Sequence, residues 1–260
     1  MLKELYTAAM GMLPQQTRLE VSANNLANAN TTGFKISEVF ERSLIEAKAN
    51  FFNTPGDAEQ DDPPTGSYVD FASGALTKTN NPLDIAIDSK NGFFVVEDQD
   101  GNQFYTRAGK FQLSTDGTIT AMDGKKLLGE EGTINGLREF LSDSQDASTA
   151  TAVNIKVTDN GELFANDRQI GNIKIADILN PETLQNVSNA DFIATKDTEV
   201  SYLTPDQKAL KQGWLEESNV NIIKEMVQMI ELQRAYETGS KVIHTNDETL
   251  DYSIGIGRVY

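Results

Sequence analysis

Side chains near the start of the chain recur in alternating steps of three and four residues. The series, apolar except at its fifth member, comprises Leu2, Leu5, Ala9, Met12, Gln16, Leu19, Ala23 and Leu26. This spacing is typical of a helix that packs on another helix along one seam. Pro14 lies inside the series and predicts a bend or interruption, because proline removes a backbone donor. The polar run from Asn28 to Gly33 then predicts that the helix ends near Asn30.

A second amphipathic pattern occupies the end of the chain. Ser218 and Asn219 are both suitable N-caps for a helix that begins there. Two apolar stripes then run side by side. The first comprises Ile222, Met226, Met229, Tyr236 and Ile243, and the second Val220, Ile223, Val227 and Ile230. An apolar face this wide predicts contact with more than one neighbouring helix.

Between these patterns, short β-prone runs alternate with turns. Asp-Gly or Asn-Gly pairs occur at 100–101, 116–117, 123–124 and 160–161. Such pairs favour two-residue hairpin loops, because both central residues tolerate positive φ. Strands are predicted at 93–96, 103–107, 110–113, 118–121, 153–157 and 173–178.

Together the patterns predict an α+β fold, in which N- and C-terminal helices pack as a coiled coil and the middle is mostly antiparallel β. The helical domain is expected to comprise residues 1–40 and 213–260, and the β-rich domain residues 41–212. Segments 53–67 and 142–152 are rich in turn-forming and small polar residues. They predict mobile connections.

Composition narrows the range of functions. The chain has 260 residues, no cysteine and a net charge of −17, and residues 41–212 hold 28 of its 39 acidic side chains. This acidity argues against binding to nucleic acid or anionic lipid. The lack of cysteine excludes disulfides and thiol chemistry. Because no apolar run matches a bilayer and no signal-peptide pattern is present, we expect no membrane insertion and, in an exported protein, no signal cleavage.

Candidate catalytic or metal-binding residues are few. The only histidine, His244, precedes Asp247 and Glu248 by about one turn, where a helical ion pair is the simplest role. Motifs for nucleotide binding, zinc hydrolysis or a nucleophile elbow do not occur. Residues 98–102 resemble a calcium-binding loop, but Gly101 comes too early, so a hairpin turn is favoured. We therefore expect no enzymatic activity, no cofactor and no bound metal.

Three parts of the chain resemble a known family. Residues 24–35 read NNLANANTTGFK, which resembles the N-terminal signature of the bacterial flagellar rod and hook family of axial proteins. Residues 213–221 read GWLEESNVN, and with residues 225–237 they are similar to that family's C-terminal signature. Residues 74–87 and 105–111 resemble the β domain that rod members share. The resemblance covers nearly the whole chain and is weakest near residues 45–67.

This resemblance implies a structural subunit of the flagellar basal-body rod, with the terminal helices in the inner wall of a shaft and the β domain outside. The subunits are expected to polymerise helically through these helices into a drive shaft that transmits torque across the periplasm. The implied partners are further copies, other rod, hook or ring proteins, and the flagellar export apparatus. The short span from Lys35 to Leu76 favours a proximal rod protein over a distal one.

The resemblance also implies which residues meet other subunits. They combine apolar positions of both helices with the polar residues at the helix ends. The expected interface residues are Leu5, Met12, Leu19, Asn24, Asn25, Leu26, Asn28, Gly33, Phe34, Ser218, Asn219, Val220, Met226, Met229, Ile230 and Tyr236. The asparagines are expected to bond backbone groups of adjacent subunits, and Gly33 to permit a reversal of the chain.

A second class of function stays open on the residues alone. A soluble β-rich module for ligand binding or adhesion has the same pattern if its terminal helices close their own core. The two hypotheses differ in whether packing inside one chain satisfies both apolar seams. Under the rod hypothesis, the helices order fully only when neighbouring subunits supply the missing faces.

Overall fold

The chain folds as two compact units. The computed structural model describes residues 2–41, 65–135, 137, 154–188 and 190–257. The helical unit comprises Met1–Ala27, Ser37–Asp70 and Val220–Tyr260, and the β unit comprises Asn28–Ile36 and Phe71–Asn219. The connection predicted at 142–152 lies outside the described residues, as do residues 53–64 of the other connection.

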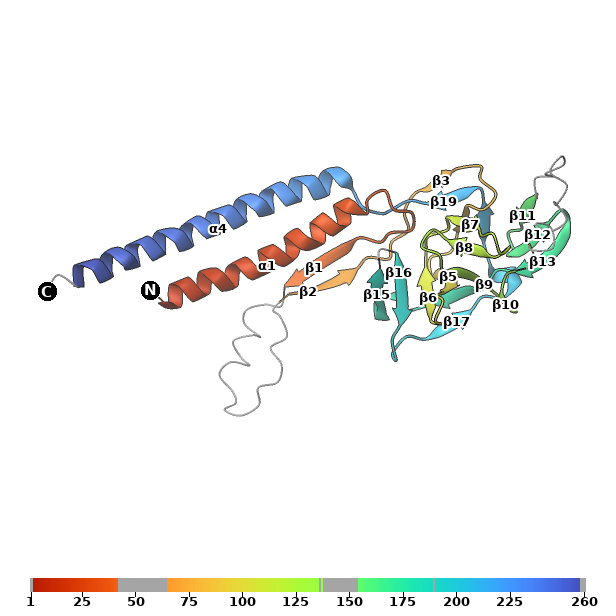
Figure 1. Ribbon diagram of the computed structural model, residues 1–260, viewed down its shortest axis with the longest axis horizontal. Coiled ribbons are helices and arrows are strands. Elements are labelled where there is room, and N and C mark those ends of the chain that lie inside the picture. Colours follow the sequence, from red (N-terminus) through yellow and green to blue (C-terminus); the bar gives the residue numbers. More distant parts are fainter. Residues whose placement is uncertain (1, 42–64, 136, 138–153, 189, 258–260) are drawn as a thin grey trace. The chain divides into compact units, whose positions relative to one another are not determined.

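Two antiparallel helices dominate the helical unit. α1 (Leu2–Ala27) and α4 (Ile222–Gly257) lie side by side (Figure 1). Ser22, near the end of α1, bonds Glu225 at the start of α4, whereas Met12 lies beside Gly239, farther along α4. Residue numbers therefore rise along one helix in the direction in which they fall along the other, so the two helices are antiparallel. Both predicted helices are confirmed.

The helix boundaries bear on two predictions. Pro14 does not interrupt α1, and α1 contacts α4 on both sides of the proline, at Met12 and Ser22. The N-cap of α4 is Asn221, whose Oδ1 accepts the Lys224 N–H at 3.1 Å. The prediction of Ser218 or Asn219 as the cap was wrong, because α4 begins only at Ile222.

A hairpin completes the helical unit. β1 (Ser37–Glu41) and β2 (Thr65–Val69) pair antiparallel, with Ser37 opposite Val69. β1 contacts α1, and the Tyr68 hydroxyl donates to the Glu38 carboxylate across the pair.

The β unit consists of antiparallel sheets. The ten-stranded main sheet has the order β15-β16-β6-β5-β9-β8-β7, with β10 beside β9, β14 beside β5 and β17 beside β14. Its strands are β5 (Gly92–Glu97), β6 (Gln103–Thr106), β7 (Phe111–Leu113), β8 (Ile119–Ala121), β9 (Lys126–Gly129), β10 (Gly132–Thr133), β14 (Ile175–Ile178), β15 (Leu184–Ser188), β16 (Asp191–Ala194) and β17 (Val200–Tyr202). All six predicted strands are present, with ends shifted by one or two residues.

Three smaller sheets flank the main one. β11 (Ile155–Val157), β12 (Glu162–Ala165) and β13 (Arg168–Asn172) form a three-stranded sheet. β4 (Ile85–Ile87) pairs with β18 (Leu210–Gln212), and β3 (Leu76–Lys78) pairs with β19 (Trp214–Glu216). The last two pairs attach the C-terminal part of the β unit to its N-terminal part.

Four hairpin loops share one geometry. In each, the first residue bonds the carbonyl four positions on, and its own carbonyl accepts the N–H of the fourth residue. The loops span 98–102, 114–118, 121–125 and 158–162. The fourth residue is a glycine with φ between +75° and +88°, and the residue before it does not take positive φ. These are type I turns closed by a glycine bulge, so the predicted two-residue loops were wrong at these sites. Positive φ at two successive residues occurs instead at Asn166 and Asp167, between β12 and β13.

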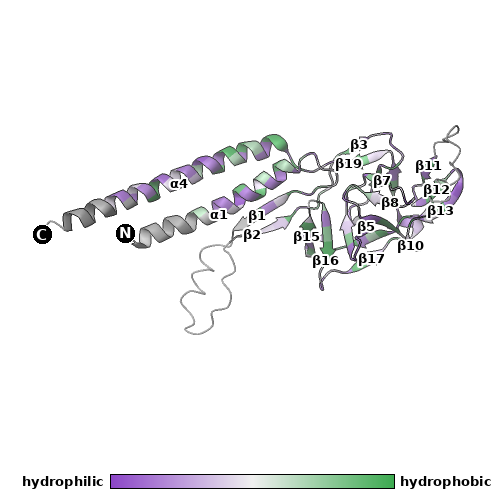
Figure 2. Ribbon diagram, viewed as in Figure 1, coloured by the Kyte–Doolittle hydropathy of each residue, from purple (hydrophilic) through white to green (hydrophobic). Residues whose placement is uncertain are grey.

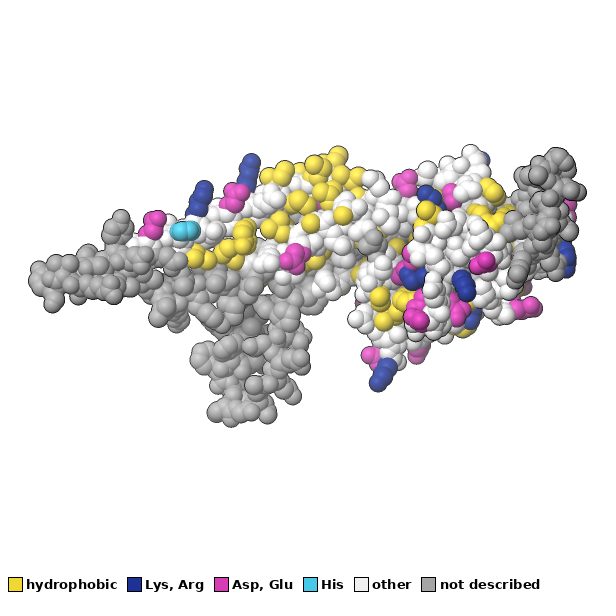
Figure 3. Space-filling view, viewed as in Figure 1, with side chains coloured by type: hydrophobic (Ala, Val, Ile, Leu, Met, Phe, Trp, Pro, Cys, Tyr) yellow, Lys and Arg dark blue, Asp and Glu magenta, His cyan; other side chains and the backbone are white. Residues whose placement is uncertain are grey.

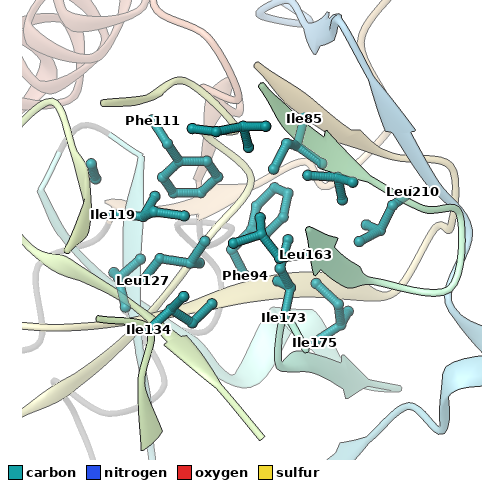
Figure 4. Packing of buried hydrophobic residues seen from close by; sticks show 14 of the residues in the cluster. Ile85, Phe94, Phe111, Ile119, Leu127, Ile134, Leu163, Ile173, Ile175 and Leu210 are labelled. Atoms are coloured by element: carbon teal, nitrogen blue, oxygen red, sulfur yellow. The ribbon is translucent and has the colours of Figure 1, made fainter. Parts of the chain in front are cut away.

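An apolar core joins the sheets of the β unit (Figure 4). Phe94 of β5 meets Phe111 of β7 edge to face, with ring centroids 5.1 Å apart. Leu163 brings the three-stranded sheet into this cluster, and Leu210 brings β18. The core therefore includes the β4–β18 pair and the three-stranded sheet as well as the main sheet.

Truncation of a core leucine tests this packing. Leu163→Ala is expected to lower the free energy of unfolding by about 2–5 kcal/mol, because the side chain is fully buried and its loss leaves a cavity. The matched change Leu179→Ala, at a side chain that is 62% exposed, should change it by less than about 0.5 kcal/mol. Urea unfolding followed by circular dichroism measures both, and equal losses would contradict the assigned core.

Candidate assembly surface and chain junction

The first turns of α4 expose a continuous apolar surface. It is formed by Ile222, Ile223, Met226, Val227 and Ile230, and is called the apolar arc below. These side chains are 41–76% exposed, and their helical spacing places them in one sector of α4. Figure 2 colours the ribbon of these turns as hydrophobic, and Figure 3 shows hydrophobic side chains gathered over them. A contiguous exposed apolar surface marks an interaction site, unlike scattered apolar side chains.

α4 packs on α1 through a different face. Glu225 and Leu232 are buried, and Gly239 lies so close to α1 that an added Cβ would be 3.3 Å from Met12 Cγ. These three residues are seven positions apart, which keeps them on one side of the helix. The Glu225 carboxylate accepts a hydrogen bond from Ser22 Oγ at 2.8 Å. Contact with α1 therefore covers this seam and leaves the apolar arc open.

A groove extends along the two helices beside the apolar arc. Its apolar part includes two residues of the arc, and polar side chains of both helices border it. The lining residues are Gln15, Arg18, Asn221, Ile223, Lys224, Val227, Gln228, Glu231, Leu232 and Ala235. The open surface is thus concave where Ile223 and Val227 border the groove.

The end of α1 is fastened to the hairpin by an asparagine. Asn25 is 2% exposed. Its Nδ2 donates to the Ser37 carbonyl at 2.8 Å, and its Oδ1 accepts the Ser37 N–H at 3.0 Å. This reciprocal pair holds β1 against α1 within one chain.

A buried group of charges lies in the β unit, where residues from both ends of the sequence meet. Lys35, Arg107 and Glu216, called the junction cluster below, are all 3% exposed or less. Glu216 Oε1 accepts from Lys35 Nζ at 2.6 Å and from the Gly74 N–H at 3.0 Å. Glu216 Oε2 lies 3.5 Å from Arg107 Nη1. One carboxylate therefore faces two cations in a site that excludes water.

Arg107 is held by the main sheet as well. Its guanidinium lies over the Phe93 ring, 4.9 Å from the centroid, and its Nη2 donates to the Lys90 carbonyl. Burial lowers the pKa of Arg107, and the nearby Glu216 charge partly offsets that effect. Arginine stays protonated in proteins, so the guanidinium is a fixed positive charge under this site.

Backbone contacts join the same segments. The Gly33 N–H donates to the Glu216 carbonyl at 2.8 Å. Asn219 Oδ1 accepts the Ile36 N–H at 2.7 Å, and Asn219 Nδ2 donates to the Ala72 carbonyl at 3.2 Å. Gly33 has φ +69°, and a Cβ there would lie 2.4 Å from backbone atoms of Arg107 and Ala108. Only glycine fits both the conformation and the space.

The predicted interface residues fall into three groups. Met226 and Ile230 belong to the exposed arc, and Tyr236 is 38% exposed. Asn25, Asn28, Gly33 and Phe34 are buried. The remainder lie on α1, at the start of α4 or just before it: Met12, Leu19, Leu26, Ser218, Val220 and Met229 are partly buried, Asn24 is exposed, Asn219 bonds Ile36 and Ala72, and Leu5 lies in the part of α1 whose side chains are not described.

Sequence patterns alone gave no role to the junction cluster. Lys35, Arg107 and Glu216 all lie within the segments that resemble the family, yet charged residues are expected on the surface. The available signal was local: Glu216 directly follows the apolar residues Trp214 and Leu215 in a β-prone segment.

The residues considered for catalysis or metal binding lie at a helix surface and in a hairpin loop. His244 is exposed on α4. In the 98–102 loop, the Asp98 carboxylate accepts the Asp100 and Asn102 N–H groups and Asn102 Nδ2, and these Asn102 bonds lower the pKa of Asp98. The loop is the predicted hairpin turn. Among the described residues, neither helix combines the length and apolar composition that crossing a bilayer requires.

Three family models match separate parts of the chain. Residues 5–35 match the flagella basal body rod protein model, and residues 86–165 match the flagellar hook protein FlgE/F/G D1 domain. Residues 211–256 match the flagellar basal body rod FlgEFG protein C-terminal model. The matches include residues of α1, the β unit and α4.

Whole-length relatives agree with these matches. The chain is 34% identical to flagellar basal-body rod protein FlgG of Agrobacterium fabrum, over 95% of this chain and 96% of the relative. It is 33% identical to the FlgG protein of Borreliella burgdorferi, over 99% and 100%. Flagellar basal-body rod protein FlgF of Caulobacter vibrioides is 28% identical, over 94% and 93%.

A glycine substitution tests the close approach at Gly33. Gly33→Ala is expected to lower the free energy of unfolding by more than about 3 kcal/mol, because the new methyl group collides with the backbone in addition to the strain of positive φ. Gly124→Ala is the matched control, since Gly124 has φ +88° but no atom within 4 Å of an added Cβ. It should lose only about 1–2 kcal/mol. Chemical denaturation compares the two, and equal losses would remove the steric explanation.

Proposed function

Because the chain belongs to the flagellar basal-body rod protein family, and is a structural subunit of the rod in the flagellar basal body, we propose that copies polymerise helically through α1 and α4. The polymer forms a drive shaft that transmits torque across the periplasm. Family membership implies a non-enzymatic role and assembly with other rod and hook proteins.

The observation that carries this proposal is the exposed apolar arc. The seam through Glu225 and Leu232 already meets α1 inside one chain, while Ile223 remains 76% exposed. Packing within one chain thus satisfies one face of α4 and leaves the other in water. The alternative, a binding module whose helices close their own core, requires both faces to be satisfied.

The arc suits the helices of neighbouring copies. Neighbouring helices bury apolar side chains without leaving backbone groups unpaired, because each helix bonds its own backbone. The seven-residue spacing of Glu225, Leu232 and Gly239 supports coiled-coil packing between α1 and α4. In the assembly, further helices occupy the arc and complete a wall several helices deep.

A shaft also requires an interface that does not close on itself. A patch that meets a different patch on the next copy generates a helical filament when the rotation does not return to the start. The proposed interface extends beyond the arc to Val220, Met229 and Tyr236, and on α1 to Met12, Leu19 and Leu26.

Ring proteins and the export apparatus are further proposed partners, and placement in the proximal rod stays a prediction.

Paired substitutions on one sector of α4 test the arc. Met226→Ser with Ile230→Ser removes apolar contacts worth about 1–3 kcal/mol for each side chain that a neighbour buries. Gln233→Ser with Glu237→Ser is the control, because these exposed residues lie seven positions later on the same sector. The first variant should lose swimming and rod formation, whereas the control should keep both.

The isolated subunits provide the second readout. Both double variants should unfold within about 0.5 kcal/mol of each other, since the changed side chains are exposed in the single chain. Swimming in soft agar, electron microscopy of basal bodies and denaturation of the purified chain supply the data. Normal rods in the Met226/Ile230 variant would contradict the proposed interface.

A further inference from the structure

Two segments meet at the junction cluster, and strand pairing holds only one of them in place. Residues 213–219, the platform, include β19 and follow β18, and these strands pair with β3 and β4. Residues 28–36, the latch, contain no helix or strand. Hydrogen bonds tie the latch to the platform, among them Gly33 N–H to Glu216 O, Lys35 Nζ to Glu216 Oε1, and Ile36 N–H to Asn219 Oδ1.

The junction cluster also holds two cations but only one anion. Lys35 Nζ and Arg107 Nη1 both lie within 3.5 Å of the Glu216 carboxylate. Arg107 is positioned by Phe93 and Lys90, independently of the latch. A docked platform without the latch therefore keeps an opposite-charge pair, Glu216 with Arg107. A docked latch without Glu216 buries two positive charges together, which is strongly unfavourable.

We infer that residues 28–36 form a latch that closes last, onto a β unit in which Glu216 is already in place. Docking then runs against the order of the sequence, because the earlier segment waits for the later one. Lys35 is the closing contact, since its ammonium needs Glu216 and also donates to the Ala72 carbonyl at 2.8 Å. The inference concerns the single chain and does not depend on assembly.

Removing either partner of the Lys35–Glu216 pair should have unequal effects. Glu216→Gln leaves Lys35 and Arg107 buried without an anion, so the latch should open and its amides should exchange at least about tenfold faster. Lys35→Met leaves Glu216 paired with Arg107, so the latch amides should exchange no more than about threefold faster. In both variants the platform amides should stay within about threefold of the unaltered protein, because strand pairing holds them.

The double variant gives the sharpest comparison. Adding Lys35→Met to Glu216→Gln removes one of the two facing cations, so latch exchange should return toward that of Lys35→Met alone. Such a recovery would show that the unpaired Lys35 charge, rather than the loss of the other Glu216 contacts, opens the latch. Lys125→Met is the control, because Lys125 also bridges two carboxylates, Asp123 and Asp191, in the same unit. It should leave the latch unchanged.

The measurement is hydrogen exchange of the full-length, unassembled chain, resolved to peptides covering residues 28–36, 213–219 and 92–97. Faster latch exchange in Glu216→Gln than in Lys35→Met, with recovery in the double variant, supports the inference. Equal opening in the two single variants, or a platform that opens as much as the latch, overturns it. Failure of the apolar arc to mediate assembly would leave these results unaltered.

Discussion

The buried Glu216 carboxylate is the contact on which the arrangement of the chain ends depends. It receives Lys35 from the N-terminal segment, the Gly74 N–H from the segment before β3, and the charge of Arg107 from the main sheet. A buried carboxylate without these partners is strongly unfavourable. The group therefore allows one arrangement of three segments that are distant in the sequence, and it favours specificity over maximum stability.

α4 combines a satisfied face with an unsatisfied one, and both follow from its sequence. The seam against α1 uses Glu225, Leu232 and Gly239, of which only one is a large apolar residue. The larger apolar side chains are concentrated in the arc, where α1 does not reach them. In the proposed polymer, the stronger hydrophobic surface would be kept for other copies, while a weaker one joins the two helices of the single chain.

Local patterns predicted the elements of this protein better than their partners. The three-four spacing located both helices, and the Asp-Gly and Asn-Gly pairs located four hairpins. The loops are type I turns with a glycine bulge and not the two-residue loops that were expected. The predicted interruption at Pro14 does not occur, and α1 contacts α4 on both sides of the proline. The junction cluster was not predicted from the sequence, because Lys35 and Glu216 are 181 positions apart. No local rule predicts that two charged side chains will neutralise each other in the interior.

The separation of Ser22 and Glu225 has a kinetic meaning. These residues meet although 203 positions lie between them in the numbering, and closing so long a flexible loop costs about 5 kcal/mol of chain entropy. A fully folded β unit removes most of that cost, because its hydrogen bonds, such as Gly33 N–H to Glu216 O, bring residues 28–36 and 213–219 together. The β unit then acts as a short tether between two helices, and their pairing becomes nearly as local as that of a helical hairpin.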